Sequence, residues 1–355
     1  MSALPPVVDV HAHVLLPGLA TFAEQADPEG WTRARDLEVR RNGPASMATS
    51  GDMVGERIPQ LTDLDRRLAD MDATGVDVQI VSPSPSHFYY HLEREPALEA
   101  AHRANQAVRD LVERAPGRLN GLGLVPLQHP ELMVDALEHA VTDCGLLGVE
   151  IGSFAPEPAA TAEPEAGGTT VELSDARLDP FWARAEELGA LVFLHPFGCS
   201  LDERLDRYYL ANTVSQPAEN AVALSHLIFS GVLDRFPELR LLAAHGGGYL
   251  PTTLGRSDRA WEVRPEAREC IHPPSSYVRR IWFDSLVHSP REIRALVDAV
   301  GSSRVLLGSD YPFDMGSDDP VADLRAGSLS GAAETAILAG NASALGLGPA
   351  SRNTD

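Results

Sequence analysis

The 355-residue sequence contains no lysine, and all 29 of its basic residues other than histidine are arginine. Without a lysine amine, the chain cannot form a Schiff base with a carbonyl substrate, and it cannot bridge two metal ions through a carbamylated lysine. The lysine that a Walker-type phosphate loop normally uses is missing too. This absence therefore excludes three kinds of active site.

Cysteines and long apolar runs are also scarce. The three cysteines, Cys144, Cys199 and Cys270, form no CxxC pair, which argues against a thiolate metal site and suits a reducing compartment. No apolar run approaches the ~18 residues of a membrane-spanning helix, and no secretory signal is visible before Asp9. We therefore expect a cytoplasmic protein that has no membrane partner.

Basic charge is limited as well. The 29 basic residues face 51 aspartates and glutamates, which gives a formal net charge of -22. Because such a field repels a phosphate backbone, we expect no nucleic-acid partner.

Short runs rich in valine, isoleucine and leucine alternate with amphipathic stretches along the whole chain. The predicted strands cover residues 6–13, 76–82, 119–127, 148–153, 190–196, 240–246, 281–286 and 305–311. The predicted helices cover residues 61–74, 99–114, 130–144, 179–188, 219–236 and 290–300. Eight strands separated by helices indicate an α/β fold with parallel strands, and this number favours a closed (β/α)8 barrel over an open sheet.

Two segments interrupt the alternation within a single predicted domain of residues 1–348. Residues 16–60 form a polar insertion after the first strand, with a short hairpin-like stretch, and we expect them to be a lid over the barrel mouth. Residues 155–174 have the Pro, Glu and Gly bias of a flexible surface loop. Residues 349–355 are expected to form a frayed tail.

The sequence VDVHAH places two histidines near the end of the first predicted strand. Alternate side chains of a strand point the same way, so His11 and His13 can reach one ion from one face. Two ordinary strand histidines would explain an isolated HxH equally well. The position favours a metal site, because barrel enzymes place their chemistry at the C-terminal ends of the strands.

Three further predicted strands end in residues of the same kind. His195 follows an apolar run, His245 precedes three glycines, and Asp310 ends the last strand. A catalytic divalent ion takes three or four protein ligands and leaves one position open. We assign His11, His13, His195 and Asp310 as ligands of a single metal ion.

Two other residues of these strand ends have roles that the sequence leaves more open. His245 is then available as an acid or base, since an imidazole exchanges protons near neutral pH. Glu150, at the end of the fourth predicted strand, is either a group that supports the metal ligands or one half of a structural pair with arginine.

These motifs resemble the amidohydrolase superfamily, and within it the relatives of aminocarboxymuconate-semialdehyde decarboxylase. The resemblance rests on VDVHAH, GVEIG, FLHP, AAHGGGYLP, FDSLVH and VLLGSDYPF, and it covers nearly the whole chain apart from the two insertions. It implies a distorted (β/α)8 TIM barrel with an insertion after strand 1. It also implies one divalent metal ion, zinc in the namesake enzyme and manganese in some aromatic-acid decarboxylases.

Carried over by position, the resemblance implies the same four ligands, with His245 handling a proton on metal-bound water. Arg256, eleven residues after His245, would bind a substrate carboxylate across a homodimer interface. Arg57, in the insertion, is the nearest match to a second carboxylate-binding arginine. Phe197 stands where the family has a tryptophan over the substrate, and the stretch from His87 to His91 suggests a differently shaped pocket.

We therefore expect a metal-dependent non-oxidative decarboxylase of a small unsaturated or aromatic carboxylic acid, with catalytic residues His245 and Asp310. Hydrolysis or hydration of an amide, lactone or activated double bond would use the same ligands. A third alternative is a binding protein in which the metal ion is only structural, which a complete ligand set beside His245 disfavours.

Overall fold

The computed structural model describes residues 5–156 and 170–349. Eight parallel strands form one sheet in the order β1-β2-β3-β4-β7-β8-β9-β10, and each coincides with a predicted strand. The strands are β1 (Val8–Val14), β2 (Val78–Pro83), β3 (Leu119–Leu124), β4 (Gly148–Ile151), β7 (Leu191–Leu194), β8 (Arg240–Ala243), β9 (Trp282–Asp284) and β10 (Val305–Leu306).

The sheet closes between its last and first strands. Val10 N–H donates to the Leu307 carbonyl at 2.8 Å, and Asp310 N–H donates to the His11 carbonyl at 2.8 Å. A single bridge pairs Ala12 with Tyr311. The strands of this closure are irregular, since β10 has only two residues and β1 shifts its register after Asp9. The fold is the predicted distorted (β/α)8 barrel.

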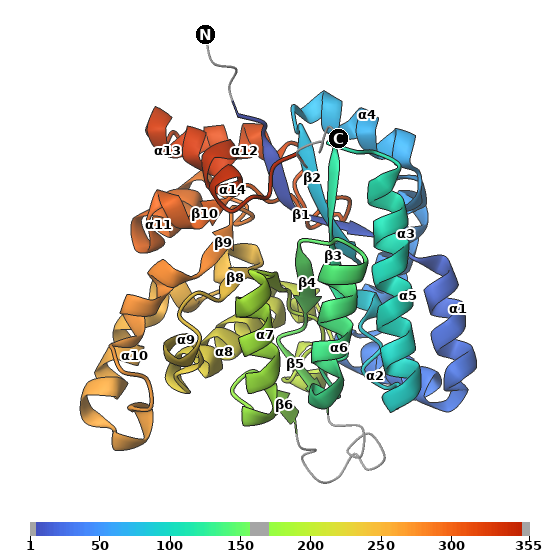
Figure 1. The fold of residues 1–355 in the computed structure, drawn as a ribbon, viewed down its shortest axis with the longest axis horizontal. Coiled ribbons are helices and arrows are strands. Elements are labelled where there is room, and N and C mark those ends of the chain that lie inside the picture. Colours follow the sequence, from blue (N-terminus) through green and yellow to red (C-terminus); the bar gives the residue numbers. More distant parts are fainter. Residues whose placement is uncertain (1–4, 157–169, 350–355) are drawn as a thin grey trace.

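The helices surround this barrel, with α1, α3 and α5 on one side and α10 and α11 on the other (Figure 1). They are α1 (Pro17–Ala26), α2 (Pro28–Asn42), α3 (Pro44–Thr62), α4 (Leu64–Thr74), α5 (Arg94–Glu113), α6 (Met133–Glu138), α7 (Asp179–Leu188), α8 (Gln216–Phe229), α9 (Val232–Arg235), α10 (Leu250–Val263), α11 (Pro290–Val300), α12 (Pro320–Ala326), α13 (Gly331–Thr335) and α14 (Asn341–Ala344). Within the described residues, no helix has both the length and the apolar character that crossing a bilayer requires.

Alternation along the strands divides the core into two layers. Val8, Val10, Ile80 and Phe193 belong to the cluster inside the barrel. The alternate residues of the same strands, such as Val192 next to Phe193, pack outward against the helices. Because this apolar cluster fills the barrel interior, the polar side chains at the C-terminal ends of the strands lie directly above the hydrophobic core.

The insertion after β1 is helical, so the predicted hairpin-like stretch is wrong. Pro17, Pro28 and Pro44 each occupy the first turn of α1, α2 and α3, where a missing N–H costs nothing. The Asp27 carboxylate accepts from the Gly30 amide and caps α2. These prolines and glycines, which suggest turns when read alone, mark the boundaries between three consecutive helices.

The second predicted excursion, residues 155–174, is described only at its ends. Here β5 (Phe154–Pro156) and β6 (Thr170–Glu172) form an antiparallel pair. Residues 157–169, and residues 350–355 of the predicted tail, lie outside the described residues. The predicted helix 219–236 is divided at Gly231, whose left-handed φ of 70° separates α8 from α9.

Candidate metal centre

Four ligand-type side chains converge at the C-terminal end of the barrel. His11 and His13 come from β1, His195 follows β7, and Asp310 follows β10. One ligand atom from each lies within 4.8 Å of the others, and all four residues are buried. The structure therefore brings together the four residues that the sequence predicted as metal ligands.

The separations within this cluster suit a single ion. His11 Nε2 lies 3.1 Å from His13 Nε2, and Asp310 Oδ1 lies 3.4 Å from His11 Nε2 and 3.2 Å from His13 Nε2. Two atoms that each lie ~2.1 Å from one ion are about 3.0 Å apart at a right angle and about 3.4 Å apart at the tetrahedral angle. These atoms already have the spacing of ligands in one coordination sphere.

Unpartnered polar atoms at the centre of the cluster test whether a cation fits. The His195 Nδ1–H donates to the Pro196 carbonyl at 3.0 Å, which leaves the lone pair on Nε2. That Nε2 atom is buried without a hydrogen-bond partner. A buried lone pair without a donor is costly, and three imidazoles with one carboxylate are a natural donor set for zinc and neighbouring metals. The residues fit a divalent cation.

The histidines of the cluster differ in their protonation states, and this difference determines which of them must lose a proton when a metal ion binds. Burial lowers the pKa of His11, but Asp310 and Asp284 outweigh this effect and raise it to about 10. Burial lowers the pKa of His13, and lowers that of His195 well below its usual value. His13 and His195 are therefore neutral donors at neutral pH, whereas a metal ion must displace a proton from His11.

Asp284, at the end of β9, is a functional candidate that the sequence interpretation missed. Its carboxylate accepts from His11 Nδ1 at 2.6 Å, which leaves His11 Nε2 to face the cluster. It also accepts from the backbone amides of His245 and Gly246, both at 2.9 Å. The signal was present in FDSLVH, because this aspartate ends a predicted strand just as His195 and Asp310 do.

His245 lies on the more open side of the cluster. Its Nε2 atom is 3.5 Å from Asp310 Oδ2, and its side chain is 19% exposed. The backbone of His245 has a left-handed φ of 53°, and the glycines after it allow a close approach. A Cβ atom at Gly247 would lie 2.5 Å from the Phe283 ring, and one at Gly248 would lie 2.1 Å from the Pro217 carbonyl oxygen. The HGGG sequence therefore fits a turn that aims His245 at Asp310.

Glu150 on β4 faces the barrel interior and is fully buried. Neither carboxylate oxygen has a hydrogen-bond partner, and no arginine pairs with it among the described residues, so the arginine-paired alternative is wrong. Burial raises the pKa of Glu150 well above its usual value, although Ser82 and His11 lower it. Burial therefore favours the neutral form of this carboxyl group.

The two predicted substrate-binding arginines occupy different environments. Arg57 on α3 lies near the loop after β10, where its Nη1 atom is 3.9 Å from Asp318 Oδ1. Arg256 is exposed on α10, and it makes no hydrogen bond or ion pair within the described part of the chain. Neither guanidinium is among the groups that contact the four-residue cluster within one protomer.

The aromatic groups next to the cluster differ from the predicted one. Phe197 packs against Phe88, with ring centroids 6.1 Å apart, in the apolar cluster beneath the insertion. Two other phenylalanine rings contact the ligands: the Phe193 centroid lies 4.9 Å from that of His11, and the Phe313 centroid lies 5.5 Å from that of His13. Burial and the negative charges of Asp314 and Asp310 raise the pKa of Tyr209.

The loop after β2 anchors the insertion. His87 is buried, and its Nε2 accepts from the backbone amide of Leu16, where the insertion begins, at 2.9 Å. Its Nδ1–H then donates to the Tyr89 hydroxyl at 2.8 Å. Burial lowers the pKa of His87 to about 4, so it stays neutral. Tyr90 accepts from the Gly152 amide at 2.9 Å. These contacts give His87 and Tyr90 structural partners.

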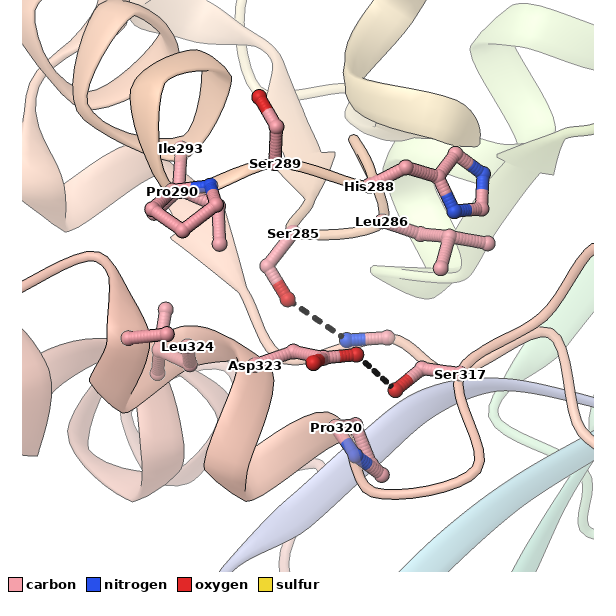
Figure 2. Close-up of a pocket in the computed structure, with 12 residues that line it drawn as sticks. Ser285, Leu286, His288, Ser289, Pro290, Ile293, Ser317, Pro320, Asp323 and Leu324 are labelled. Carbon is pink, nitrogen blue, oxygen red and sulfur yellow. Dashed lines mark hydrogen bonds between the residues drawn. The ribbon is translucent and has the colours of Figure 1, made fainter.

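A small pocket lies next to the segments that follow β9 and β10 (Figure 2). It opens between the loops after β9 and β10 and the first turns of α11 and α12, and Leu286, Ile293 and Leu324 supply much of its apolar wall. Its lining contains none of the four ligands. Ser285 and Gly308, which lie next to Asp284 and close to Asp310 in sequence, connect its wall to the site.

Fold and site together define a metal-dependent barrel enzyme of the amidohydrolase type. The protein-family model described as Amidohydrolase matches residues 8–345 of the chain. The chain belongs to this family, as the sequence motifs predicted.

Several relatives are named decarboxylases. The chain is 32% identical over 348 residues to 2-amino-3-carboxymuconate-6-semialdehyde decarboxylase of Dictyostelium discoideum, covering 96% of this chain and 92% of that one. It is 30% identical over 259 residues to gamma-resorcylate decarboxylase of Rhodococcus jostii (strain RHA1), covering 70% and 77%. It is 24% identical over 329 residues to 2-keto-4-carboxy-3-hexenedioate hydratase of Sphingobium sp., covering 88% and 85%.

Solved structures share the fold. Dihydroxybenzoic acid decarboxylase from Polaromonas sp. JS666, solved with bound manganese and the inhibitor 2-nitroresorcinol, superimposes with a TM-score of 0.75 at 23% identity, covering 96% of this chain and 97% of that one. At this identity the likeness supports the barrel architecture.

We predict that Asp284→Asn lowers the affinity of the site for Mn²⁺ about 10- to 100-fold. If the asparagine oxygen takes the Oδ1 position, it keeps the Gly246 and Leu286 amides. Its NH2 group then faces two donors, His11 Nδ1 and the His245 amide. Titration of metal-free protein with Mn²⁺, followed by the electron paramagnetic resonance signal of free Mn²⁺, measures this change. Asp298→Asn, an exposed position on α11, is the matched control. Equal affinities for both variants would show that Asp284 does not orient His11.

Proposed function

We propose that this protein is a metal-dependent non-oxidative decarboxylase, a carbon-carbon lyase that acts on a small unsaturated or aromatic carboxylic acid. The observation that carries the proposal is the convergence of His11, His13, His195 and Asp310 beside His245. Two decarboxylases that are at least 30% identical support the reaction class.

The proposed cofactor is one divalent metal ion held by His11, His13, His195 and Asp310. A bound ion of this kind would act as a Lewis acid that polarises a carboxylate or an adjacent oxygen of the substrate. Zinc is the metal implied by the sequence resemblance, and manganese is supported by the manganese-bound Polaromonas decarboxylase. Both metals suit a site of imidazole and carboxylate donors.

The reaction breaks the bond between the carboxylate carbon and the adjacent unsaturated carbon. The electron pair stays on that carbon, carbon dioxide leaves, and a proton must replace the lost group. His245, 3.5 Å from Asp310 and partly exposed, is the proposed carrier of this proton. Asp310 also holds His245 in place. Burial raises the pKa of Asp310, but His11, His13 and His245 outweigh burial and keep it ionised.

Recognition of the substrate is assigned to groups around the barrel mouth. Arg57 and Arg256 are proposed to bind carboxylates by paired hydrogen bonds. Phe197, in the apolar cluster beneath the insertion, is proposed to shape the substrate pocket. The insertion is proposed to be a lid, because Arg40 of α2 donates to Asp202 in the loop after β7 at 3.1 Å. A cytoplasmic location also remains a prediction.

Hydration or hydrolysis is the second candidate, and the similarity to a hydratase favours it. To distinguish the reactions, the metal-loaded enzyme is incubated in H2¹⁸O with the acids that appear in the names of the similar enzymes, including gamma-resorcylate. We expect one carbon dioxide per substrate consumed and no ¹⁸O in the organic product. Incorporation of ¹⁸O without release of carbon dioxide would establish the alternative.

The two kinds of histidine are expected to respond differently to substitution. His195→Ala removes a ligand and should lose both metal and activity. His245→Asn should keep most of the metal and lower kcat about 10²- to 10⁴-fold, the usual contribution of a positioned acid or base. Metal content by mass spectrometry, measured beside kcat, checks both. Undiminished turnover in the His245 variant would contradict its role in proton transfer.

We propose a homodimer in which Arg256 serves the partner's site, since within one protomer its guanidinium is exposed and unpaired in the described residues. Arg256→Ala should lower kcat/KM about 10- to 150-fold, because a hydrogen bond to a charged group contributes about 1.5–3 kcal/mol. Arg259→Ala, on the same helix and paired with Glu262, is the control.

Mixing two variants of reduced activity tests the shared site directly. A mixed dimer of Arg256→Ala and His245→Asn subunits contains one intact site if Arg256 acts across the interface. Activity should therefore return on mixing. No recovery after confirmed subunit exchange would show that Arg256 serves its own protomer or none.

A further inference from the structure

Arg67 on α4 is a fully buried arginine behind the metal cluster, with 2% of its surface exposed. Its Nη2 donates to the carbonyl oxygens of His13 at 2.6 Å and Gln60 at 3.1 Å. Its Nη1 donates to Gln79 Oε1 at 2.6 Å. No carboxylate forms an ion pair with it among the described residues. Burial lowers the pKa of Arg67 to about 10, so the guanidinium keeps its charge at neutral pH.

Gln79 on β2 connects this charge to a buried carboxylate. Its Oε1 accepts from Arg67, and its Nε2 donates to Asp9 Oδ2 at 2.9 Å. Asp9 in turn accepts from the backbone amides of His11 at 3.1 Å and Ser309 at 3.0 Å. The Ser309 hydroxyl donates to Asp9 Oδ2 at 2.6 Å. With four donors directed at it, the Asp9 side chain is an acceptor on every side.

The segments joined by these contacts carry three of the four metal ligands. Arg67 holds the backbone of His13, and Asp9 holds the backbone of His11 and of Ser309, the residue before Asp310. The sheet has little regular pairing at this place, since β10 ends at Leu306 and only one bridge joins its continuation to β1. Side-chain hydrogen bonds therefore add to the few backbone hydrogen bonds, such as that from the Asp310 amide to the His11 carbonyl, where β1 meets the Asp310 segment.

We propose that Arg67, Gln79 and Asp9 form a closure network that positions His11, His13 and Asp310 around the metal ion. The three residues contact the backbone of the ligand-bearing segments, so they are positioning residues. This inference deepens the proposed metal-dependent function and rests on it.

The residue types suit this task. A planar guanidinium reaches three acceptors in different directions, whereas a lysine ammonium is a compact charge that cannot span them in the same way. The Gln79 amide accepts on one side and donates on the other, so it satisfies Arg67 and Asp9 together. A glutamate at this position would keep the first contact and place a second negative charge against Asp9.

The Tyr311 ring completes the setting of Arg67. The guanidinium carbon lies 4.8 Å from its centroid, and the Tyr311 hydroxyl donates to Asp70 Oδ2 at 2.8 Å. Tyr311 follows Asp310 directly. A displacement of Arg67 would therefore be transmitted to the segments on both sides of the metal cluster.

The test measures metal binding, which needs no turnover. Metal-free full-length Arg67→Lys and Gln79→Glu are titrated with Mn²⁺ under the electron paramagnetic resonance signal of free Mn²⁺. The Co²⁺-loaded proteins are compared by visible absorption, which reports ligand geometry. We expect affinities at least 10-fold below wild type and changed Co²⁺ bands in both variants. Arg103→Lys, at an exposed arginine of α5 that pairs with Glu99, should differ from wild type less than 2-fold.

Each outcome decides a specific point. Folded variants with wild-type Mn²⁺ affinity and unchanged Co²⁺ bands would overturn the network's positioning role, even if their unfolding midpoints fell. If Arg67→Lys does not fold, the near-isosteric Gln79→Glu variant decides by the same measurements. If neither variant folds, Ser309→Ala decides, with an expected loss of Mn²⁺ affinity. It removes the hydroxyl that contacts Asp9, the His11 carbonyl and the Tyr311 amide. A wild-type protein that binds no Mn²⁺, Co²⁺ or Zn²⁺ would instead refute the proposed function.

Discussion

The constraint on which the site depends is the crowding of three imidazoles and one carboxylate in a buried volume. His11 and His13 bring their Nε2 atoms to 3.1 Å, and His195 adds a lone pair that finds no donor. In a medium of low dielectric, such an arrangement is costly unless a positive charge occupies its centre. In the metal-free protein the proton on His11 provides part of that charge, and a divalent cation would take the place of that proton.

The surrounding structure maintains this arrangement at some conformational cost. His245 and Asp310 both adopt left-handed backbone conformations, with φ of 53° and 57°, which non-glycine residues rarely occupy. Each such residue costs on the order of 1–3 kcal/mol unless its surroundings determine it. The bonds from the His245 amide to Asp284, and from the Asp310 amide to the His11 carbonyl, are of that determining kind.

The site also divides into a buried half and an accessible half. Asp284, Asp9 and Glu150 lie on the buried side, where two of them accept hydrogen bonds and the third has no partner. His245 and the two candidate arginines lie toward solvent. This separation suits a reaction in which the metal ligands stay fixed while a carboxylic acid enters and a proton is exchanged. Because the chain has a net charge of -22, binding of an acid would depend on local positive charge, which the proposal assigns to the metal ion and the two candidate arginines.

Local sequence determined the strands, because each strand lies within an apolar run that ends in turn or ligand residues. That periodicity placed His11, His13, His195 and Asp310 at one end of the barrel, and parallel strands must bring such ends together. Sequence also predicted α7 and α11 with their observed bounds, since Gly189 and Gly301 follow them directly.

Only the tertiary structure decided the partners of those residues. Asp284 contacts His11 across 273 residues of sequence, and Arg67 reaches Asp9 through a glutamine on another strand, so no local pattern reveals either link. The helical insertion was misread because its prolines mark helix starts as well as turns. Side chains that are distant in the sequence come into contact only when the barrel closes. Those contacts, together with the low dielectric of the interior, determine the protonation states and the orientations of the site residues.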